Sequence, residues 1–600
     1  MDQARWVPPD GVVAAANLTD AMQERGFDNY DAFYAWSASD RSGFWGYTVD
    51  RLGIVEFRPH HTVLDGSAHH PRWLVGARMN IVESCFTADP GSVAVVLSRR
   101  GKMTGLSYHE LHREACRFAN GLVANRLRPG DRVAIAMPMN IEAVIAYLGV
   151  VLAGGVVVSI ADSFAPAEIE TRLRIAGTQL VVTQDVIHRA GKTLPMYEKV
   201  IAAGAGRAIV VTTGAGIELR AGDVSWADFI PVNSGFEAVP RDPGDHINIL
   251  FSSGTTGEPK AIPWTHTAAI KAASDGHYHQ DIHPGDTVAW PTNLGWMMGP
   301  WLIFASLING ATIALYEDAP TSQGFARFVE EAGVTVLGVV PSLVAAWRAS
   351  GVAEDCDWSG VRLFSSTGEA SNSSDMAYLM GLAGGKPIIE YIGGTEIGGG
   401  YMTGTVLQPC VPSTFTTPTL GGAIHILDEN GDPAEVGELF IEPPTMGLSI
   451  ELLNRDHDDV YYSGTPVHNG VQLRRHGDRI ERLPGGRFRA HGRVDDAMNL
   501  GGIKVSSAQI ERTVLGTRGL VEAAAIAVEP EGGGPSSLVM YVVASGEAEL
   551  TEMTAEMQRR IRDRLNPLFK ISDVVQVEEL PRTASAKVMR RSLRSDYSER

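Results

Sequence analysis

Cysteine is scarce in this chain. The 600 residues include four, Cys85, Cys116, Cys356 and Cys410, and no two of them form a Cys-x-x-Cys pair. This spacing argues against a disulfide framework and against a thiolate zinc site. Positive charge is also in deficit, because 51 Lys and Arg residues stand against 70 Asp and Glu residues, which gives a net charge of −19. Such a chain repels nucleic acid and anionic membranes, so we expect neither as a partner and expect a reducing, cytosolic location.

Long apolar runs and targeting signals are also rare. Residues 1–10 lack the apolar core of a signal peptide, and Ser598-Glu599-Arg600 is not a Ser-Lys-Leu address, so we expect no targeting segment. One run, Ala143–Ile160, reaches transmembrane length, but Gly154-Gly155 divides it into a helix-like half and a β-branched half. We therefore predict a helix followed by a buried strand, with no membrane anchor.

Short β-branched runs alternate with helical periodicity along most of the chain. Residues 132–137, 156–160 and 180–183 read as strands, and 141–151 reads as a helix. This alternation is typical of βαβ units. It predicts an α/β fold, with a large N-terminal region of stacked, mostly parallel sheets and a small, mobile C-terminal α/β lid. The residue pattern changes after about residue 490, where the charged segment Arg493–Asp496 precedes Gly501-Gly502. We place the boundary between the large region and the lid there.

A loop of small residues follows the apolar strand pattern at Ile249–Phe251. The loop is rich in Gly, Ser and Thr and ends in Pro259-Lys260. Glycines let the backbone bend so that successive N–H groups face one anion, while hydroxyls add donors and the lysine adds charge. The spacing does not match a P-loop. We predict a phosphate-binding loop formed by Ser252, Ser253, Gly254, Thr255, Thr256, Gly257 and Lys260.

Five further segments carry short motifs in a fixed order. They are Gly393-Gly394-Thr395-Glu396, Gly437-Glu438-Leu439, His476-Gly477-Asp478, Gly492-Arg493-Val494-Asp495-Asp496 and Thr583-Ala584-Ser585-Ala586-Lys587. Together with the loop, they resemble the motifs of the acyl-adenylate-forming (AMP-binding) enzymes, which include acyl-CoA synthetases, luciferases and the adenylation domains of peptide synthetases. Six matches in one order are far more specific than any one of them.

Other segments resemble the acetyl-CoA synthetase branch of that family. They are Phe44-Trp45, Trp73–Asn80 and Asn293–Trp296. The C-terminal stretches RAHGRVDDAMNLGGIKVSS and LPRTASAKVMRR are most similar to the plant acyl-activating enzymes of this branch. The resemblance implies a cap at residues 1–90, an AMP-binding domain at 91–493 and a C-terminal lid domain at 494–600.

The resemblance implies ATP-dependent activation of a carboxylic acid to an acyl-adenylate, followed by transfer to coenzyme A. The first step brings two anions together, so positive charge and Mg²⁺ must offset their repulsion. ATP, Mg²⁺ and coenzyme A are therefore the expected cofactors, and a medium-chain, branched or aryl acid is the expected substrate. Three alternatives stay open. In the first, the enzyme passes the acyl group to a carrier-protein thiol or an amine instead of coenzyme A, or activates another oxyanion instead of a carboxylate. The second is an acetate or propionate ligase, and the third is a binding or regulatory protein descended from the enzyme.

The motifs also imply roles for single residues. Lys587 is expected to bridge the carboxylate and the α-phosphate, Thr395 to contact a phosphate oxygen, and Glu396 to hold Mg²⁺. Asp478 resembles the aspartate that binds both ribose hydroxyls, and Asp495 resembles the hinge of the lid.

Further contacts to the nucleotide and to coenzyme A are implied around these residues. Arg493 is expected to contact the ribose and a phosphate, and Gly368-Glu369-Ala370 to pass along the adenine. Lys504 occupies a position where this branch often has an arginine facing the phosphates, so charge is kept but the bidentate fork is lost. Gly501-Gly502 is expected to approach the pantetheine, where a side chain would obstruct it.

Two positions depart from the family pattern. The aromatic residue that stacks on adenine falls at Ile392, with Tyr391 beside it as the candidate replacement. The tryptophan that closes the acyl pocket of acetyl-CoA synthetases falls at Gly393, next to Gly394. Loss of an indole removes about 150–200 Å² of contact surface. We therefore expect a pocket larger than acetate requires, lined by Trp296, Gly393 and Gly398.

Overall fold

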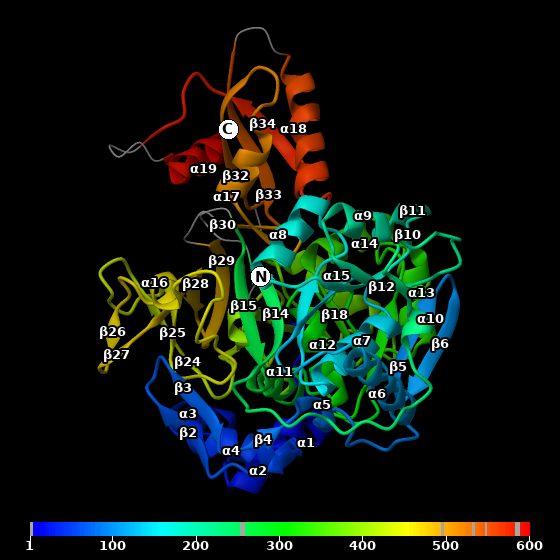
Figure 1. Ribbon diagram of the computed structural model, residues 1–600. Helices are drawn as coiled ribbons and strands as arrows, with labels where there is room; N and C mark the ends of the chain where they lie inside the picture. The colour runs from blue at the N-terminus through cyan, green and yellow to red at the C-terminus, as the bar shows by residue number, and fades with distance from the viewer. Residues whose placement is uncertain (1–3, 253–257, 494–496, 531–533, 546–548, 583–587) are drawn as a thin grey trace.

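The computed structural model describes residues 4–252, 258–493, 497–530, 534–545, 549–582 and 588–600. A large N-terminal region carries a smaller C-terminal lobe on one side (Figure 1). The predicted α/β fold class, with stacked sheets and a small C-terminal lobe, is confirmed.

Two seven-stranded sheets form the centre of the large region. In the first, with the order β13-β12-β9-β7-β8-β14-β15, the antiparallel pair is β14–β15 and the other neighbours run parallel. Its strands are β7 (Arg132–Ala136), β8 (Val156–Ile160), β9 (Leu180–Gln184), β12 (Arg207–Val211), β13 (Val224–Ser225), β14 (His246–Ser252) and β15 (Lys260–Thr265).

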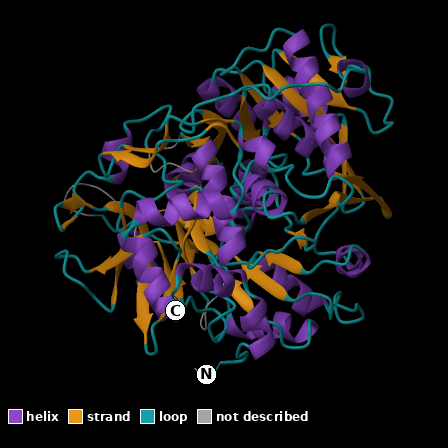
Figure 2. Ribbon diagram, turned by 90° about the horizontal axis from the view of Figure 1, so that it is seen from below, coloured by secondary structure: helices purple, strands orange, loops and turns teal. Residues whose placement is uncertain are grey.

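The second sheet has the order β20-β19-β18-β16-β17-β5-β6, and its antiparallel pair is β5–β6. Its strands are β5 (Val93–Arg99), β6 (Lys102–Ser107), β16 (Thr287–Ala289), β17 (Thr312–Tyr316), β18 (Val336–Val339), β19 (Leu363–Ser366) and β20 (Ile388–Glu390). Seen from below, helices lie on both sides of the strands (Figure 2). The inner strands are buried, as β7 and β8 show, which explains their β-branched, nearly continuous apolar sequences.

The apolar run at 143–160 is a buried helix and strand, as predicted. Helix α7 (Ile141–Leu152) begins where the Asn140 side chain accepts a hydrogen bond from the Ala143 N–H. Gly154, at φ +74°, turns the chain into β8, which is buried throughout. Helix α7 contacts β8 of the first sheet and β5 of the second. Among the described residues, no helix has both the length and the apolar character needed to cross a membrane.

Antiparallel sheets complete the large region. One contains β21 (Ile392–Gly394), β22 (Gly399–Thr403) and β23 (Thr417–Pro418), and the other contains β24 (Ala423–Leu427), β25 (Val436–Glu442), β28 (Arg474–Leu483) and β29 (Arg487–Arg493). The N-terminal helices α1 (Asp10–Ala15), α2 (Asn17–Arg25), α3 (Tyr30–Ser39) and α4 (Arg41–Arg51) lie at the opposite end from the C-terminal lobe (Figure 1). The aromatic pair predicted there, Phe44-Trp45, is fully buried.

The C-terminal lobe contains the βαβ unit expected of the tail. Strands β33 (Ser537–Ala544) and β34 (Ile571–Gln576) run parallel, and α18 (Leu550–Arg564) connects them. The other elements are β30 (Ala497–Leu500), β31 (Ile503–Ser506), α17 (Ser507–Val514), β32 (Leu520–Val528) and α19 (Arg590–Glu599). The predicted boundary at 493/494 adjoins residues 494–496, which lie outside the described residues, so the three domain ranges stay predictions.

Helix α11 (His266–Tyr278) contains a buried ion pair, and its carboxylate also bonds to residues next to the Gly393–Glu396 motif. Lys271 Nζ donates to Asp275 Oδ1 at 2.5 Å, and both side chains are buried. Asp275 Oδ2 also accepts hydrogen bonds from the Tyr391 hydroxyl at 2.6 Å and from the Gly400 N–H at 2.9 Å. Burial lowers the pKa of Lys271, an effect that the adjacent carboxylate opposes. One carboxylate thus fixes a helix, the residue before β21 and strand β22.

Removing this carboxylate should destabilise the large region. Asp275→Ala leaves the Lys271 ammonium buried without its partner, a loss that costs about 3–5 kcal/mol. The measurement is the denaturant midpoint of the folded chain. The matched control is the double variant Lys271→Met with Asp275→Asn, which removes both charges but keeps an acceptor for Gly400, and it should lose much less. An equal loss in the two proteins would contradict this role.

Candidate active site

A cavity of about 830 Å³ lies between the large region and the C-terminal lobe. Its wall includes residues that directly follow parallel strands of the second sheet, namely Trp290 after β16, Val340 after β18, Thr367 after β19 and Tyr391 after β20. This is the edge of an open α/β sheet at which ligands bind. The lobe contributes Asn499, Gly501, Gly502, Ile503 and Lys504.

A charged group adjoins the cavity next to its lining residues Thr395 and Asp478 and is built around Glu396, on a short 3₁₀ helix that begins at Thr395. The Glu396 side chain is buried, and its Oε1 lies 4.0 Å from Lys260 Nζ and 3.8 Å from His476 Nδ1. Burial alone would raise the pKa of Glu396, but the positive charges of Lys504 and Lys260 hold it well below its usual value. Strand β15, the 3₁₀ helix, β28 and the C-terminal lobe thus converge on one carboxylate.

The second oxygen of this carboxylate can hold a metal ion. Glu396 Oε2 is buried and, within the described ranges, has no hydrogen-bond partner. A buried oxygen without a donor is costly unless a ligand satisfies it, and a carboxylate oxygen is the ligand type that Mg²⁺ prefers. The residues present therefore fit the predicted Mg²⁺ ligand.

The predicted ribose residue Asp478 lies close to this group. It is buried on β28, its Oδ2 accepts from the Tyr401 hydroxyl at 2.6 Å, and it lies 3.3 Å from His476 Nε2. Strands β28 and β29 place the backbone of Arg493 directly opposite Asp478. The cavity lining includes Asp478, Thr395 and Gly394. The motifs 393–396 and 476–478, some 80 positions apart by sequence, thus meet at one end of the cavity.

The predicted phosphate-binding loop joins β14 to β15. Ser252 is the last residue of β14 and pairs with Lys260, the first residue of β15. The structure therefore places the two ends of the loop side by side. Residues 253–257, together with the predicted hinge Asp495 and the predicted catalytic Lys587, lie outside the described residues.

The residues expected at the adenine lie in two environments. Ile392 is half-buried and lines the cavity. Tyr391 also lines it, but its hydroxyl accepts from Trp301 Nε1 at 3.1 Å and donates to Asp275, so the polar end of this ring is bonded within the core. The segment Gly368-Glu369-Ala370 lies in the cavity wall as well.

Gly393 and Gly398, the two glycines predicted in the acyl pocket, both lie close to the backbone of neighbouring segments. A Cβ at Gly393 would lie 2.1 Å from the Gly399 carbonyl oxygen, so the close approach of β21 and β22 requires glycine there. Gly393 still borders the cavity. Gly398 lies next to this segment, with a φ of +69°, and its Cβ would face the Gly447 carbonyl oxygen at 3.1 Å, so its place in the acyl pocket stays a prediction. Trp296 lines the cavity and packs edge-on against Phe164 at 5.3 Å.

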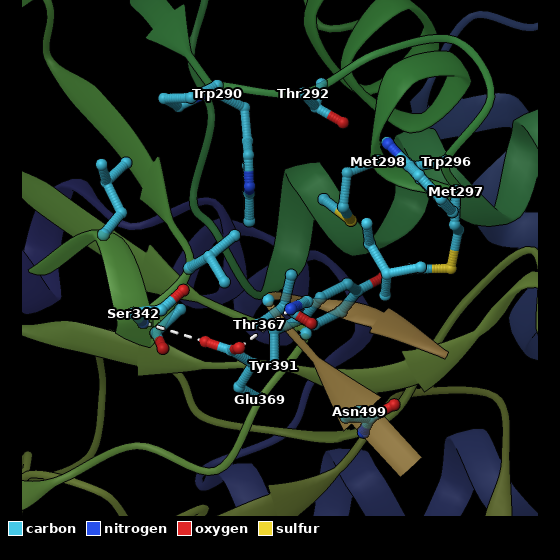
Figure 3. A pocket seen from close by; sticks show the side chains of 18 of the residues that line it. Trp290, Thr292, Trp296, Met297, Met298, Ser342, Thr367, Glu369, Tyr391 and Asn499 are labelled. Atoms are coloured by element: carbon cyan, nitrogen blue, oxygen red, sulfur yellow. Dashed lines mark hydrogen bonds between the residues drawn. The ribbon is translucent and has the colours of Figure 1, made fainter. Parts of the chain in front are cut away.

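The sequence interpretation missed the apolar wall of the cavity. Trp290, Met297 and Met298 lie together on one side of it, across from Glu369 and Ser342 (Figure 3). Trp290 follows a short β-branched run, and its place at the end of a parallel strand was the available signal. The buried ion pair was also missed, although Lys271 and Asp275 are spaced by one helical turn in a mostly apolar segment.

Comparisons with known proteins match this architecture. The AMP-binding enzyme family matches residues 83–449, the acetyl-coenzyme A synthetase N-terminus matches 30–85, and the AMP-binding enzyme C-terminal domain matches 509–587. The chain is 43% identical to probable acyl-activating enzyme 17, peroxisomal, from Arabidopsis thaliana, over 100% of this chain and 89% of the relative. It is 41% identical to hexanoyl-CoA synthase from Cannabis sativa, over 99% of this chain and 88% of the relative.

A solved structure agrees with these relatives. Acetoacetyl-CoA synthetase from Streptomyces lividans superposes with a TM-score of 0.78 at 26% identity, and the match covers 98% of this chain and 94% of that structure. The resemblance predicted from the motifs, to the acetyl-CoA synthetase branch and its plant members, is confirmed.

The prediction of a cytosolic location is wrong. The Arabidopsis relative, which matches the full length of this chain, carries a peroxisomal designation. The prediction rested on cysteine content and the absence of targeting signals. Four separate cysteines exclude a disulfide framework. They do not distinguish the cytosol from an organelle.

The match of the family over more than half of the chain, the full-length relatives and the shared fold lead to one conclusion. The chain belongs to the AMP-binding enzyme family and is an acyl-CoA synthetase, an AMP-forming acid–CoA ligase that uses ATP, Mg²⁺ and coenzyme A.

Proposed function

We propose that this acyl-CoA synthetase activates a medium-chain, unbranched carboxylic acid such as hexanoate. The observation that carries the proposal is the apolar part of the cavity wall, which includes Trp290, Met297 and Met298, and we call the space beside it the apolar arm. Apolar side chains bury methylene groups favourably, at about 0.8 kcal/mol for each CH₂. The hexanoyl-CoA synthase of Cannabis sativa, 41% identical to this chain, supports the same class of acid.

Trp290, a residue of the cavity wall, is proposed to limit the length of this arm. Its indole packs edge-on against Trp301 at 5.3 Å between ring centroids, and Trp301 is bonded to Tyr391. The other face of the indole lies on β18, where a Cβ at Gly338 would come within 1.9 Å of Trp290 Cδ2. The ring is thus held between a second tryptophan and a glycine. The methionines beside it are unbranched and flexible, so they adapt to acyl chains of different shape.

The charged end of the cavity is the proposed place of reaction. A carboxylate oxygen attacks the α-phosphorus of ATP, and the bond to pyrophosphate breaks. Lys260 and Lys504, both near Glu396, would oppose the accumulated negative charge. Mg²⁺ held by Glu396 would supply further charge neutralisation at the phosphates. In the second step the thiol sulfur of coenzyme A attacks the acyl carbon, AMP leaves, and the thiol proton is released.

The remaining site residues keep the roles implied by their motifs, as proposals. Asp478 would accept hydrogen bonds from the ribose, Thr395 would contact a phosphate oxygen, and Lys587 would bridge the carboxylate and the α-phosphate. The position of Asp478 beside His476, 3.3 Å away, supports the first of these roles because it places a buried acceptor in the cavity wall. For Lys587 the support is the sequence motif.

An acid panel tests the proposed function. Acid-dependent exchange of labelled pyrophosphate into ATP should be strongest for acids near hexanoate, and weak for acetate and for long-chain acids. Addition of coenzyme A should convert the same acids to thioesters with release of AMP. Exchange without any thioester would favour another acceptor. Absence of exchange with every acid would contradict the proposal.

The wall is tested by two variants with opposite effects. Trp290→Ala extends the arm, and because each buried methylene contributes about 0.8 kcal/mol, kcat/KM for decanoate relative to hexanoate should rise about tenfold or more. Gly338→Ala places a methyl group where the indole lies, so the ring must move into the cavity and the preference should shift to shorter acids.

Gly360→Ala is the matched control for the glycine variant, because a Cβ there meets no atom within 4 Å and the preference should stay as in the unmodified enzyme. A chain-length preference that moves in neither wall variant would show that Trp290 does not limit the acyl chain.

A further inference from the structure

Glu369 connects the large region to the C-terminal lobe. Its Oε2 accepts a hydrogen bond from the Ser342 N–H, in the first turn of α14 (Pro341–Ser350), at 2.9 Å. Its Oε1 accepts a hydrogen bond from the Gly502 N–H of the lobe, also at 2.9 Å. Figure 3 shows the carboxylate beside Ser342 at the edge of the cavity. One side chain of the cavity wall therefore contacts both parts of the molecule.

The backbones of the two parts meet closely at this point. Gly501 and Gly502 have φ values of +59° and +75°, the left-handed conformation that favours glycine. A Cβ at Gly368 would lie 3.4 Å from Gly502 Cα, and a Cβ at Gly502 would lie 3.1 Å from Val340 Cγ1. The turn between β30 and β31 thus fits directly against the segment that carries Glu369.

Three further hydrogen bonds of described residues join the two parts, and each is longer than the bond from Gly502. Asn566 Nδ2 donates to Ser163 Oγ at 3.3 Å, Gln509 Nε2 donates to Glu168 Oε1 at 3.3 Å, and the Ala165 N–H donates to the Leu565 carbonyl at 3.4 Å. The hydrogen bonds from Gly502 and from Gln509 both go to carboxylates and are charge-assisted, and the bond from Gly502 is the shorter of the two, at 2.9 Å. Burial raises the pKa of Glu369, while the Ser342 and Gly502 N–H groups favour its charged form.

We propose that Glu369 is a positioning residue for thioester formation, which holds the C-terminal lobe in the pose that presents Gly502 and Lys504 to the cavity. This inference rests on the proposed two-step reaction. In this pose the glycine turn borders the space through which a thiol would reach the acyl carbon. A rotation of the lobe for the adenylation step must break the bond to Gly502, while the bond to Ser342 stays within the large region.

The half-reactions separate this role from a general loss of structure. In Glu369→Gln and Glu369→Ala, thioester formation from supplied acyl-AMP should fall about tenfold more than pyrophosphate exchange, because both variants remove the charged acceptor of the Gly502 N–H. The matched control is Glu390→Gln. Glu390 is a buried carboxyl of the same cavity, bonded to Ser371 at 2.6 Å within the large region, and its variant should affect both steps alike. Equal losses of both steps in the Glu369 variants would overturn the proposal.

A cross-link measures the pose without activity. The double variant Ser163→Cys with Asn566→Cys places one cysteine on each part. In this pose the Ser163 Oγ and Asn566 Nδ2 atoms that they replace are 3.3 Å apart. Disulfide formation under mild oxidation should be several-fold slower when Glu369→Gln is added, and Glu390→Gln should leave its rate as before. An unchanged rate with Glu369→Gln would also overturn the proposal. If the unmodified enzyme activated no acid, the proposed function would fail while this cross-link would still decide whether Glu369 holds the lobe.

Discussion

The site depends on one buried carboxylate and the positive charge around it. Glu396 can stay ionised in the interior because Lys260 and Lys504 lie near it, and burial would otherwise favour its neutral form. Lys260 begins β15, Glu396 lies on the 3₁₀ helix after β21, and Lys504 belongs to the C-terminal lobe. The charge balance of the site therefore exists only when these separate segments are assembled. An excess of positive charge is also what a reaction between two anions requires.

A second buried carboxylate, Asp275, positions the segment that carries Glu396. Asp275 binds the Lys271 ammonium, the Tyr391 hydroxyl and the Gly400 N–H, so α11 holds both sides of the segment that contains Thr395 and Glu396. The same contacts place Trp301 and, through it, Trp290. The polar end and the apolar end of the cavity are thus positioned by one core network. A rigid core of this kind keeps reacting groups in place.

Much of the fold could be predicted from the sequence because its signals are local. The β-branched strands β7, β8 and β9 and the helix α7 appear at the predicted residues, since buried parallel strands must be apolar on both faces. The phosphate-loop and Thr395-Glu396 motifs are local as well. The surroundings of Gly398 could not be predicted, because only the fold shows that its Cβ would face the Gly447 carbonyl.

Residues whose role arises from long-range contacts could not be predicted. Glu369 and Gly502 are 133 positions apart, and Trp290 becomes a wall only because β18 brings Gly338 beneath its ring. No periodicity or spacing along the chain records such pairs. The same limit applies to Gly393, where the sequence indicated an emptied pocket and the structure shows a strand packed directly on the glycine.

Transfer of isotope from the acid to AMP tests the central claim most directly. If the enzyme joins the carboxylate to the α-phosphorus, hexanoate labelled with ¹⁸O in both carboxylate oxygens and turned over with ATP and coenzyme A must leave one ¹⁸O atom in AMP and none in pyrophosphate. Mass spectrometry of the products should show one ¹⁸O atom in AMP and none in pyrophosphate. AMP without label, or label in pyrophosphate or inorganic phosphate, would contradict formation of an acyl-adenylate.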